Sequence, residues 1–179
     1  YGDHVTAVNS IEVVLPDGSL LRTGMWASST ADAAHGHPRG FGPDVTPLFM
    51  QSGLGIITKM SRRMSPRPEM FVPLRFRVQR DEDLVPMIDA TRTLMLEGTI
   101  RNIPVIGGVL GTAAMRAPRA SWTDADSPID EATYRELMAE LGMGWWNLRA
   151  ALSGPRAIVE AQLERIREVL TAAVPDGEF

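Results

Sequence analysis

The sequence has 179 residues, enough for one domain or two small ones, and its 44% hydrophobic content is ordinary for a globular chain with a sizeable core. The formal net charge of −4 and the scattered arginines provide no basic stripe, so the pattern argues against nucleic-acid binding. The absence of cysteine excludes disulfides, thiolate metal sites and cysteine nucleophiles, and no apolar run reaches the ~18 residues of a membrane-spanning helix.

The first third of the chain predicts strands joined by glycine-rich loops. Residues 10–15 are β-branched and apolar, a Pro-Asp-Gly turn follows, and residues 19–23 resume the apolar run, which together predict a β-hairpin. Residues 24–46 have no sustained period and predict a long surface excursion. A short helical turn over 47–52 and a strand over 55–60 follow.

Two prolines, Pro66 and Pro68, favour extended backbone and mark a change in composition. We place a domain boundary there, with domains over 1–68 and 69–179. In the second domain predicted strands and helices alternate. The strands are expected over 71–79, in the β-branched run 100–109 and over 146–152. The helices are expected from the Asp81 cap to the stop at Gly98, from Ser127 to Gly142 and after Pro155.

The predicted helices carry apolar positions at helical spacing, namely Leu84, Met87, Ile88, Thr91, Leu94 and Met95 in the first and Ile158, Val159, Leu163, Ile166, Val169 and Leu170 in the last. The order β-α-β-α-β-α predicts an α+β fold in which helices cover a sheet, with antiparallel or split-βαβ connectivity at least as favoured as a Rossmann wind.

Several sequence motifs of common enzymes are absent. The chain contains no G-x-G-x-x-G after a strand, no phosphate-binding P-loop and no G-x-S-x-G nucleophile elbow. His35 and His37 could bind a metal only with further ligands, and solvated histidines are the favoured interpretation in a Gly/Ala-rich loop, so no metal site is predicted.

The most informative stretch is Gln51 to Thr58, which contains Gly53 and Gly55 immediately before an apolar strand. Glycines there let backbone N–H groups approach a ligand such as a pyrophosphate. The alternative is a helix-to-strand turn with glycine in the left-handed conformation. Asp3 and His4 are likewise open to two interpretations, since they could serve proton transfer or Asp3 could cap the turn before the hairpin.

Taken together, several segments resemble one family in order and spacing. They are Tyr1-Gly2-Asp3-His4, the hairpin Ile11 to Met25, Phe41-Gly42-Pro43, Leu48-Phe49, Gln51 to Met60, Arg101 to Pro104 and Gly142 to Pro155. The chain resembles the vanillyl-alcohol oxidase and 4-cresol dehydrogenase family of FAD-binding, PCMH-type oxidoreductases over essentially its whole length.

The resemblance implies that residues 1–68 are the end of a PCMH-type FAD-binding domain and that residues 69–179 begin an α+β substrate (cap) domain. It implies FAD as cofactor and Asp3 as the catalytic acid–base residue beside the flavin. The residues that it places at the cofactor are Tyr1, Gly2, His4, Ile11, Glu12, Val13, Gly53, Gly55, Ile56 and Ile57.

The implied reaction is oxidation of a small para-substituted phenol by hydride transfer to the flavin, with oxygen or a cytochrome as electron acceptor. Two alternatives stay open, a related flavoenzyme of an α-hydroxy acid, sugar or lactone, and a non-catalytic α+β binding domain. The start at Tyr1 predicts an internal fragment, inactive alone, of a soluble cytoplasmic or periplasmic protein with no membrane partner, and a homo-oligomer is compatible with it.

Departures from the family pattern also appear. The glycine-rich pyrophosphate loop, the His or Tyr that links the flavin and the Tyr/Arg cluster that stabilises a phenolate are not in this sequence, and His35 and His37 do not match the linkage position. Val5-Thr6-Ala7 stands where the family often has bulkier residues, so we expect a different pocket wall.

Overall fold

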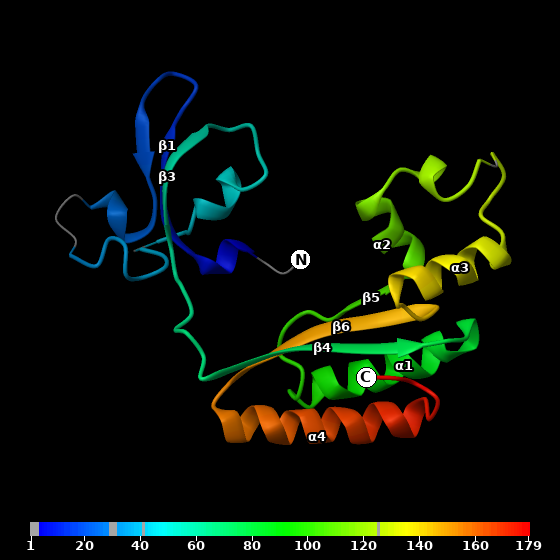
Figure 1. Cartoon of the computed structure of the whole chain (residues 1–179). Coiled ribbons are helices and arrows are strands. Elements are labelled where there is room, and N and C mark those ends of the chain that lie inside the picture. Colours follow the sequence, from blue (N-terminus) through cyan, green and yellow to red (C-terminus); the bar gives the residue numbers. More distant parts are fainter. Residues whose placement is uncertain (1–3, 29–31, 41, 125) are drawn as a thin grey trace. The chain divides into compact units, whose positions relative to one another are not determined.

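The computed structural model describes residues 4–28, 32–40, 42–124 and 126–179. The fold is α+β, and the chain divides into two compact units, Tyr1–Arg67 (unit 1) and Pro68–Phe179 (unit 2) (Figure 1). The division falls one residue before the boundary expected from the two prolines. The assignment of these units to the FAD-binding and cap domains stays a prediction.

Unit 1 is built on a three-stranded antiparallel sheet in the order β2-β1-β3. Strand β1 is Val8–Val14, β2 is Leu20–Arg22 and β3 is Ile56–Arg62. Because β1 is central, its backbone pairs with both neighbours, and nearly all of its residues are buried. The predicted hairpin and the predicted strand after Gly55 are both confirmed.

Short 3-10 helices complete unit 1, at His4–Ala7 (η1), Gly24–Ala27 (η2) and Thr46–Phe49 (η3). Phe49 from η3 packs on Val8, Ile11 and Val13 of β1 and forms a small apolar core with them. The described parts of residues 28–45 are irregular, as expected from their glycine-rich composition.

Unit 2 contains a second three-stranded sheet, β4-β6-β5, in which both neighbouring pairs are antiparallel (Figure 1). Its strands are β4 (Met70–Val78), β5 (Val105–Gly108) and β6 (Trp146–Gly154). Strands β4 and β5 are joined through a helix, yet β6 inserts between them. This is split-βαβ connectivity, one of the alternatives that the sequence left open.

Two helices, α1 (Leu84–Leu96) and α4 (Arg156–Ala173), lie side by side on one face of this sheet (Figure 1). They cover the alternate β4 residues Leu74, Phe76 and Val78, which are buried as the period-2 pattern predicted. The buried face predicted for these two helices was too wide. Ile88, Met95 and Ile158, which were assigned to it, are 43%, 43% and 52% exposed.

A smaller apolar cluster holds together α2 (Val109–Arg116) and α3 (Glu131–Leu141), with η5 (Arg119–Ser121) between them in the chain. Its buried members are Val109, Ala113, Leu137 and Met138. Helix α2 was not predicted from the sequence, because Gly111 lowers the helix propensity of a segment of only eight residues, and the preceding β-branched run masks its start.

Two predicted helix starts are wrong, the Asp81 cap and the start at Ser127. Asp130, rather than Ser127, caps α3, since its side-chain oxygen accepts a hydrogen bond from the Thr133 amide at 2.8 Å. Asp81 begins the 3-10 turn Asp81–Asp83 (η4) before α1, and its carboxylate accepts a hydrogen bond from Trp146 Nε1 at 2.9 Å. The predicted helix stops are confirmed, with left-handed Gly98 after α1 and Gly142 after α3.

Candidate functional site

The proposed catalytic residue Asp3, together with Tyr1 and Gly2, lies outside the described residues. His4 begins η1, which leads directly into the central strand β1. The catalytic assignment of Asp3 and the cofactor assignments of its neighbours therefore stay predictions.

The expected cofactor residues of the hairpin lie at the centre of unit 1. Ile11 and Val13 are completely buried in its apolar core, and the β1 backbone pairs with β2 and β3. Their side chains support the sheet from inside. A direct cofactor contact by these residues stays a prediction.

Glu12, between them, is the electrostatic centre of unit 1. Its carboxylate accepts hydrogen bonds from Arg22 Nε at 2.9 Å and from Thr58 Oγ1 at 3.0 Å, and it forms an ion pair with Lys59 Nζ at 2.9 Å. The hydrogen bonds from Lys59 and Arg22 lower the pKa of Glu12 from 4.5 to about 2. Since Arg22 is on β2 and Lys59 on β3, this one side chain links all three strands.

These partners of Glu12 were not predicted from the sequence. Arg22 is the cross-strand partner of Glu12 on β2, and Lys59 is its partner on β3. Opposite charges at directly opposed positions stabilise antiparallel pairs. The hairpin register, counted outward from the Pro-Asp-Gly turn, was the signal that could have identified Arg22.

A second cluster extends from Arg22 toward the irregular loop. The Arg22 guanidinium lies 5.0 Å from the centroid of the Trp26 ring, and the Trp26 and His35 rings meet edge to face at 4.6 Å. Trp26, His35, Lys59, Met60 and Ser61 line an open pocket of about 390 Å³. The lining of this pocket combines the Lys59 ammonium with the Trp26 and His35 rings, and Arg22 is not part of it.

Hydrogen bonds hold the loop that carries His35. Its carbonyl oxygen accepts from Asn9 Nδ2 and from Ser61 Oγ, both at 2.8 Å, and the Ala34 carbonyl accepts from Ser10 Oγ at 3.1 Å. Within the described residues no three His, Asp or Glu side chains gather into a possible metal site.

Gly55 and Gly53 differ sharply in their surroundings. A Cβ on Gly55 would lie 2.5 Å from Val13 Cγ1 and 2.8 Å from the Val14 carbonyl oxygen, whereas a Cβ on Gly53 would meet nothing within 4 Å. Neither glycine has a positive φ, and Gln51 is the left-handed residue of this turn, with φ of 52°. The interpretation with a left-handed glycine is therefore wrong, and Gly55 is needed for close approach to β1.

The segment after Gly53 exposes apolar side chains as well as backbone. Leu54 and Ile56 are 54% and 72% exposed, and among the described strands β3 pairs only with β1. The Leu54 amide donates to Ser52 Oγ at 3.4 Å, and the free edge of β3 next to apolar side chains is the kind of surface that a flavin nucleotide would need from such a segment. The residues of unit 1 therefore fit one wall of an FAD site.

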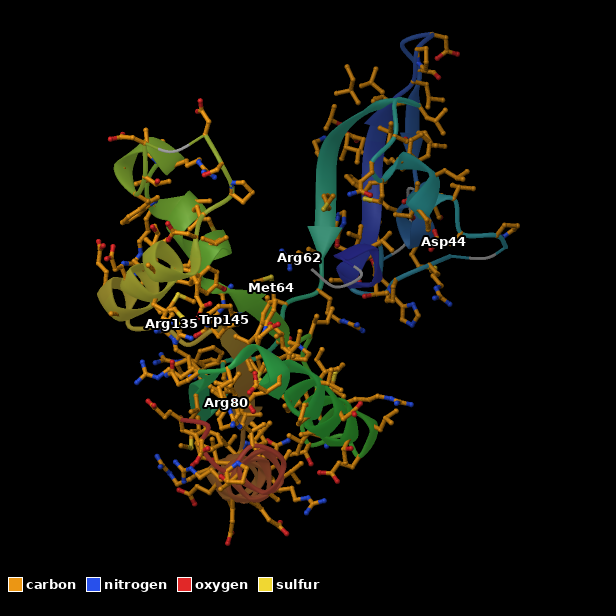
Figure 2. All side chains as sticks on the ribbon, turned by 90° about the vertical axis from the view of Figure 1, so that its right-hand side faces the viewer. Asp44, Arg62, Met64, Arg80, Arg135 and Trp145 are labelled. Atoms are coloured by element: carbon orange, nitrogen blue, oxygen red, sulfur yellow. The ribbon has the colours of Figure 1, made fainter. Side chains whose placement is uncertain are left out.

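The motif that resembles the cap domain, Gly142 to Leu148, forms the tight turn into β6. Asn147 Oδ1 accepts from the Gly144 amide at 2.9 Å, and Asn147 Nδ2 donates to the Gly144 carbonyl at 2.8 Å. Gly144 contacts the β4 backbone at Val78 so closely that a Cβ would clash. Trp145 packs beside Tyr134. The Arg135 guanidinium lies 5.5 Å from the centroid of the Trp145 ring, and the two residues are labelled side by side in Figure 2. These residues therefore position strand β6.

Comparison with known sequences identifies relatives for both units. No protein-family model matches the chain. The 4-cresol dehydrogenase flavoprotein subunit of Pseudomonas putida is 32% identical over 170 residues, which cover 94% of this chain and 33% of that protein. The 1'-carboxy-chondrochloren decarboxylase of Chondromyces crocatus is 32% identical over 166 residues, which cover 92% of this chain and 29% of that protein.

Comparison with solved structures agrees. Substrate-bound p-cresol methylhydroxylase matches with a TM-score of 0.85 and 31% identity, over 96% of this chain and 34% of that one. A 4-ethylphenol oxidase from Gulosibacter chungangensis, in complex with isoeugenol, matches with a TM-score of 0.89 and 29% identity, over 99% and 34% of the two chains. Alkyldihydroxyacetonephosphate synthase, 16% identical with a TM-score of 0.53, shares the fold.

None of the helices in the described parts of the chain is long and apolar enough to cross a membrane. The chain spans about one third of the length of the relatives that it matches. It is homologous to a segment of the PCMH-type flavoproteins, the family of 4-cresol dehydrogenase and vanillyl-alcohol oxidase.

Proposed function

We propose that the protein carrying this chain is an FAD-dependent oxidoreductase that oxidises small para-substituted phenols by hydride transfer to the flavin. The observation that carries the proposal is 32% identity to a 4-cresol dehydrogenase subunit over 94% of the chain, so that the similarity includes both units. The names of two structural relatives, p-cresol methylhydroxylase and 4-ethylphenol oxidase, support the same substrate class.

Bound FAD supplies the redox chemistry by accepting the hydride. In this proposal the chain contributes backbone groups of Gly53 to Ile57 to one wall of the cofactor site. The ion pairs of Glu12 keep the three strands of that wall in register. Asp3 accepts or shares a proton as the substrate is oxidised, and His4 orients the segment.

A second candidate function is removal of a carboxyl group from the substrate. It is favoured by one observation, the 32% identity to a relative named as a decarboxylase. Carbon dioxide release would distinguish it from the first candidate.

Anaerobic stopped-flow mixing with a para-alkylphenol tests the first function, using the gene product that contains these residues. We expect the flavin absorbance to bleach with the phenol and to persist with an α-hydroxy acid. A yellow protein that the α-hydroxy acid reduces and the phenol leaves oxidised would overturn the proposed substrate class. A colourless protein that binds no added FAD would favour a non-catalytic domain.

The role of Asp3 has its own test. Acid–base groups contribute roughly 10²–10⁴-fold to rate, so Asp3→Asn should slow flavin reduction by about that factor in a protein that stays folded and yellow. Asp17→Asn is the matched control, because Asp17 lies in the exposed turn of the hairpin and its carboxylate binds Ser19. An Asp3→Asn rate within about twofold of the parent removes Asp3 from the mechanism.

The isolated 179-residue chain should bind FAD weakly, since Gly53 to Ile57 form one wall of the site and a partly built site leaves polar groups unpaired. Titration should show little quenching of flavin fluorescence. Sub-micromolar binding would mean that the hairpin and β3 suffice.

A further inference from the structure

Unit 2 contains a pocket of about 420 Å³ that no part of the proposed reaction uses. Residues of β4 and β6, of α2 and of the end of α3 line it, together with Glu178 and Phe179. Four arginines contribute to its walls, Arg75 and Arg77 from β4, Arg116 from α2 and Arg149 from β6. Leu141, Met143 and Phe179 contribute apolar surface.

One of the four arginines is already neutralised. Arg77 Nε donates to Glu178 Oε2 at 2.9 Å, and its Nη1 donates to the Gly142 carbonyl at 2.8 Å. Glu178 is the one carboxylate side chain that lines the pocket, so the side chains of the four arginines and this acid have a formal charge of 4 − 1 = +3. The whole chain has a net charge of −4, so this is a local concentration of positive charge.

The other three arginines have no acidic partner among the described residues of unit 2. Within residues 68–124 and 126–179, no carboxylate lies within ion-pair distance of Arg75, Arg116 or Arg149. Within this unit the charges of all three guanidinium groups are therefore not balanced by a carboxylate.

The sheet register makes this arrangement unfavourable without an anion. Arg75 and Arg149 are Cα partners on the antiparallel strands β4 and β6, so their side chains leave the same face from directly opposed positions. Like charges at opposed positions destabilise a sheet. An acid at either position would form an ion pair instead, as Glu12 and Arg22 do in unit 1.

We propose that this pocket is a binding site for an amphipathic carboxylate, a small organic acid with an apolar body. Guanidinium forks match the planar carboxylate and bind it through paired N–H groups. Arg75, Arg149 and Arg116 hold the acid group, and the apolar body lies against Leu141 and Met143. The apolar walls select an organic acid over inorganic phosphate, which would gain nothing from them.

This inference does not depend on the proposed function. Every residue that it uses is in unit 2, and it needs no flavin. Its failure would leave the phenol oxidation untouched, and failure of the phenol oxidation would leave the pocket intact.

Calorimetric titration of the 179-residue chain with 4-phenylbutyrate tests the site, with neutral 4-phenylbutanamide and inorganic phosphate as comparison ligands. We expect the acid to bind at least tenfold more tightly than the amide or phosphate. Arg75→Gln and Arg149→Gln should each weaken the acid by roughly fivefold, the upper range for an exposed ion pair. Arg92→Gln, an exposed arginine of α1 outside the pocket, is the matched control and should change nothing.

Circular dichroism on each variant checks that the helices of unit 2 are retained. Equal affinity for the acid and the amide would overturn the proposal, since the charge would then do nothing. Equal affinity for the acid and for phosphate would overturn the proposal that the apolar walls select an organic acid. Unchanged acid binding in both pocket variants would show that the arginines are simply solvated.

Discussion

The two units are stabilised by different interactions. Among the described residues, the main core of unit 2 contains thirteen buried apolar side chains from the sheet, α1, α4 and neighbouring segments, whereas the core of unit 1 contains four. Unit 1 compensates with directional polar contacts around β1, where Glu12 holds Arg22 and Lys59 and the Thr23 hydroxyl both accepts from the Ile11 amide and contacts Thr46.

The stability of the two units should therefore respond to different changes in sequence and solvent. Burial of apolar area does not depend on protonation, whereas the interactions of hydrogen-bonded charges depend on the protonation of each partner. Unit 2 should fail when its core volume is cut. Unit 1 should lose stability when one charge of the Glu12 cluster is removed, or when an added side-chain atom blocks the close contact between two strands.

The largest effect should come from Phe76→Ala in unit 2. Phe76 is fully buried, packs between the sheet and its helices and contacts the Phe179 ring at 4.8 Å between centroids. Loss of a buried phenyl ring costs about 3–5 kcal/mol, including the cavity left behind. Urea unfolding followed by circular dichroism measures it, because the described α-helices all belong to unit 2.

Phe71→Ala on the same strand is the matched control, since Phe71 is 64% exposed on the opposite face. It should cost less than about 1 kcal/mol, as surface substitutions usually do. Similar losses for the two variants would contradict the division of β4 into a buried and an exposed face.

The next effect concerns Glu12 and pH. Because its folded pKa of about 2 is below the ordinary 4.5, an unfolded chain takes up the proton first as the pH falls. The stabilisation by Glu12 is therefore present above pH 4.5 and is lost as the pH falls toward about 2. The protection factors of the β1 amides, which are exchange rates corrected for the intrinsic pH dependence of exchange, should fall in that window, and Glu12→Gln should have lower protection factors already at neutral pH.

Asp17→Asn is the control for this titration, since the pKa of Asp17 is lowered by hydrogen bonds from Ser19 within one turn rather than by ion pairs between strands. Its β1 amides should keep the acid sensitivity of the parent. An equal acid response in Glu12→Gln and the parent would mean that another group controls unit 1.

A third, smaller effect separates the two glycines of unit 1. Gly55→Ala places a methyl group against Val13 and the Val14 carbonyl, and such overpacking costs typically about 1–3 kcal/mol. Gly53→Ala should be nearly neutral, because its Cβ meets open space and φ is not positive. Thermal unfolding checks both, and equal shifts in the melting temperature would refute the close approach at Gly55.

These glycines also show which features of the fold could be predicted from the sequence alone. The hairpin, strands β3, β4 and β6, and the stops at Gly98 and Gly142 were predictable, because local hydrophobic period and turn residues determine them. The role of Gly55 was not, since the clash depends on Val13, which is 42 residues away in the chain. Its position before a strand pointed to a left-handed turn that Gln51 adopts instead.

The candidate site divides in the same way. The homology was visible in the order and spacing of short segments, and the sequence identities bear it out. The contacts of Glu12 with Lys59 and the opposition of Arg75 and Arg149 could not be predicted, because each depends on the pairing register of strands distant in sequence. The predicted Asp81 cap was wrong for a similar reason, since the Asp81 carboxylate accepts a hydrogen bond from Trp146, 65 residues later in the chain.

The smallest predicted effect concerns the charges of two opposed arginines in unit 2. Arg149→Gln removes one of two like charges at directly opposed positions of β4 and β6, so it should stabilise unit 2 by about 0.2–1 kcal/mol. Salt screens the repulsion, so the gain should shrink between low and high ionic strength. Urea unfolding at two salt concentrations measures it, with Arg92→Gln as the control. A destabilised Arg149→Gln would show instead that the arginine stem packs usefully on the sheet, and the opposed pair would then be no sign of a missing anion.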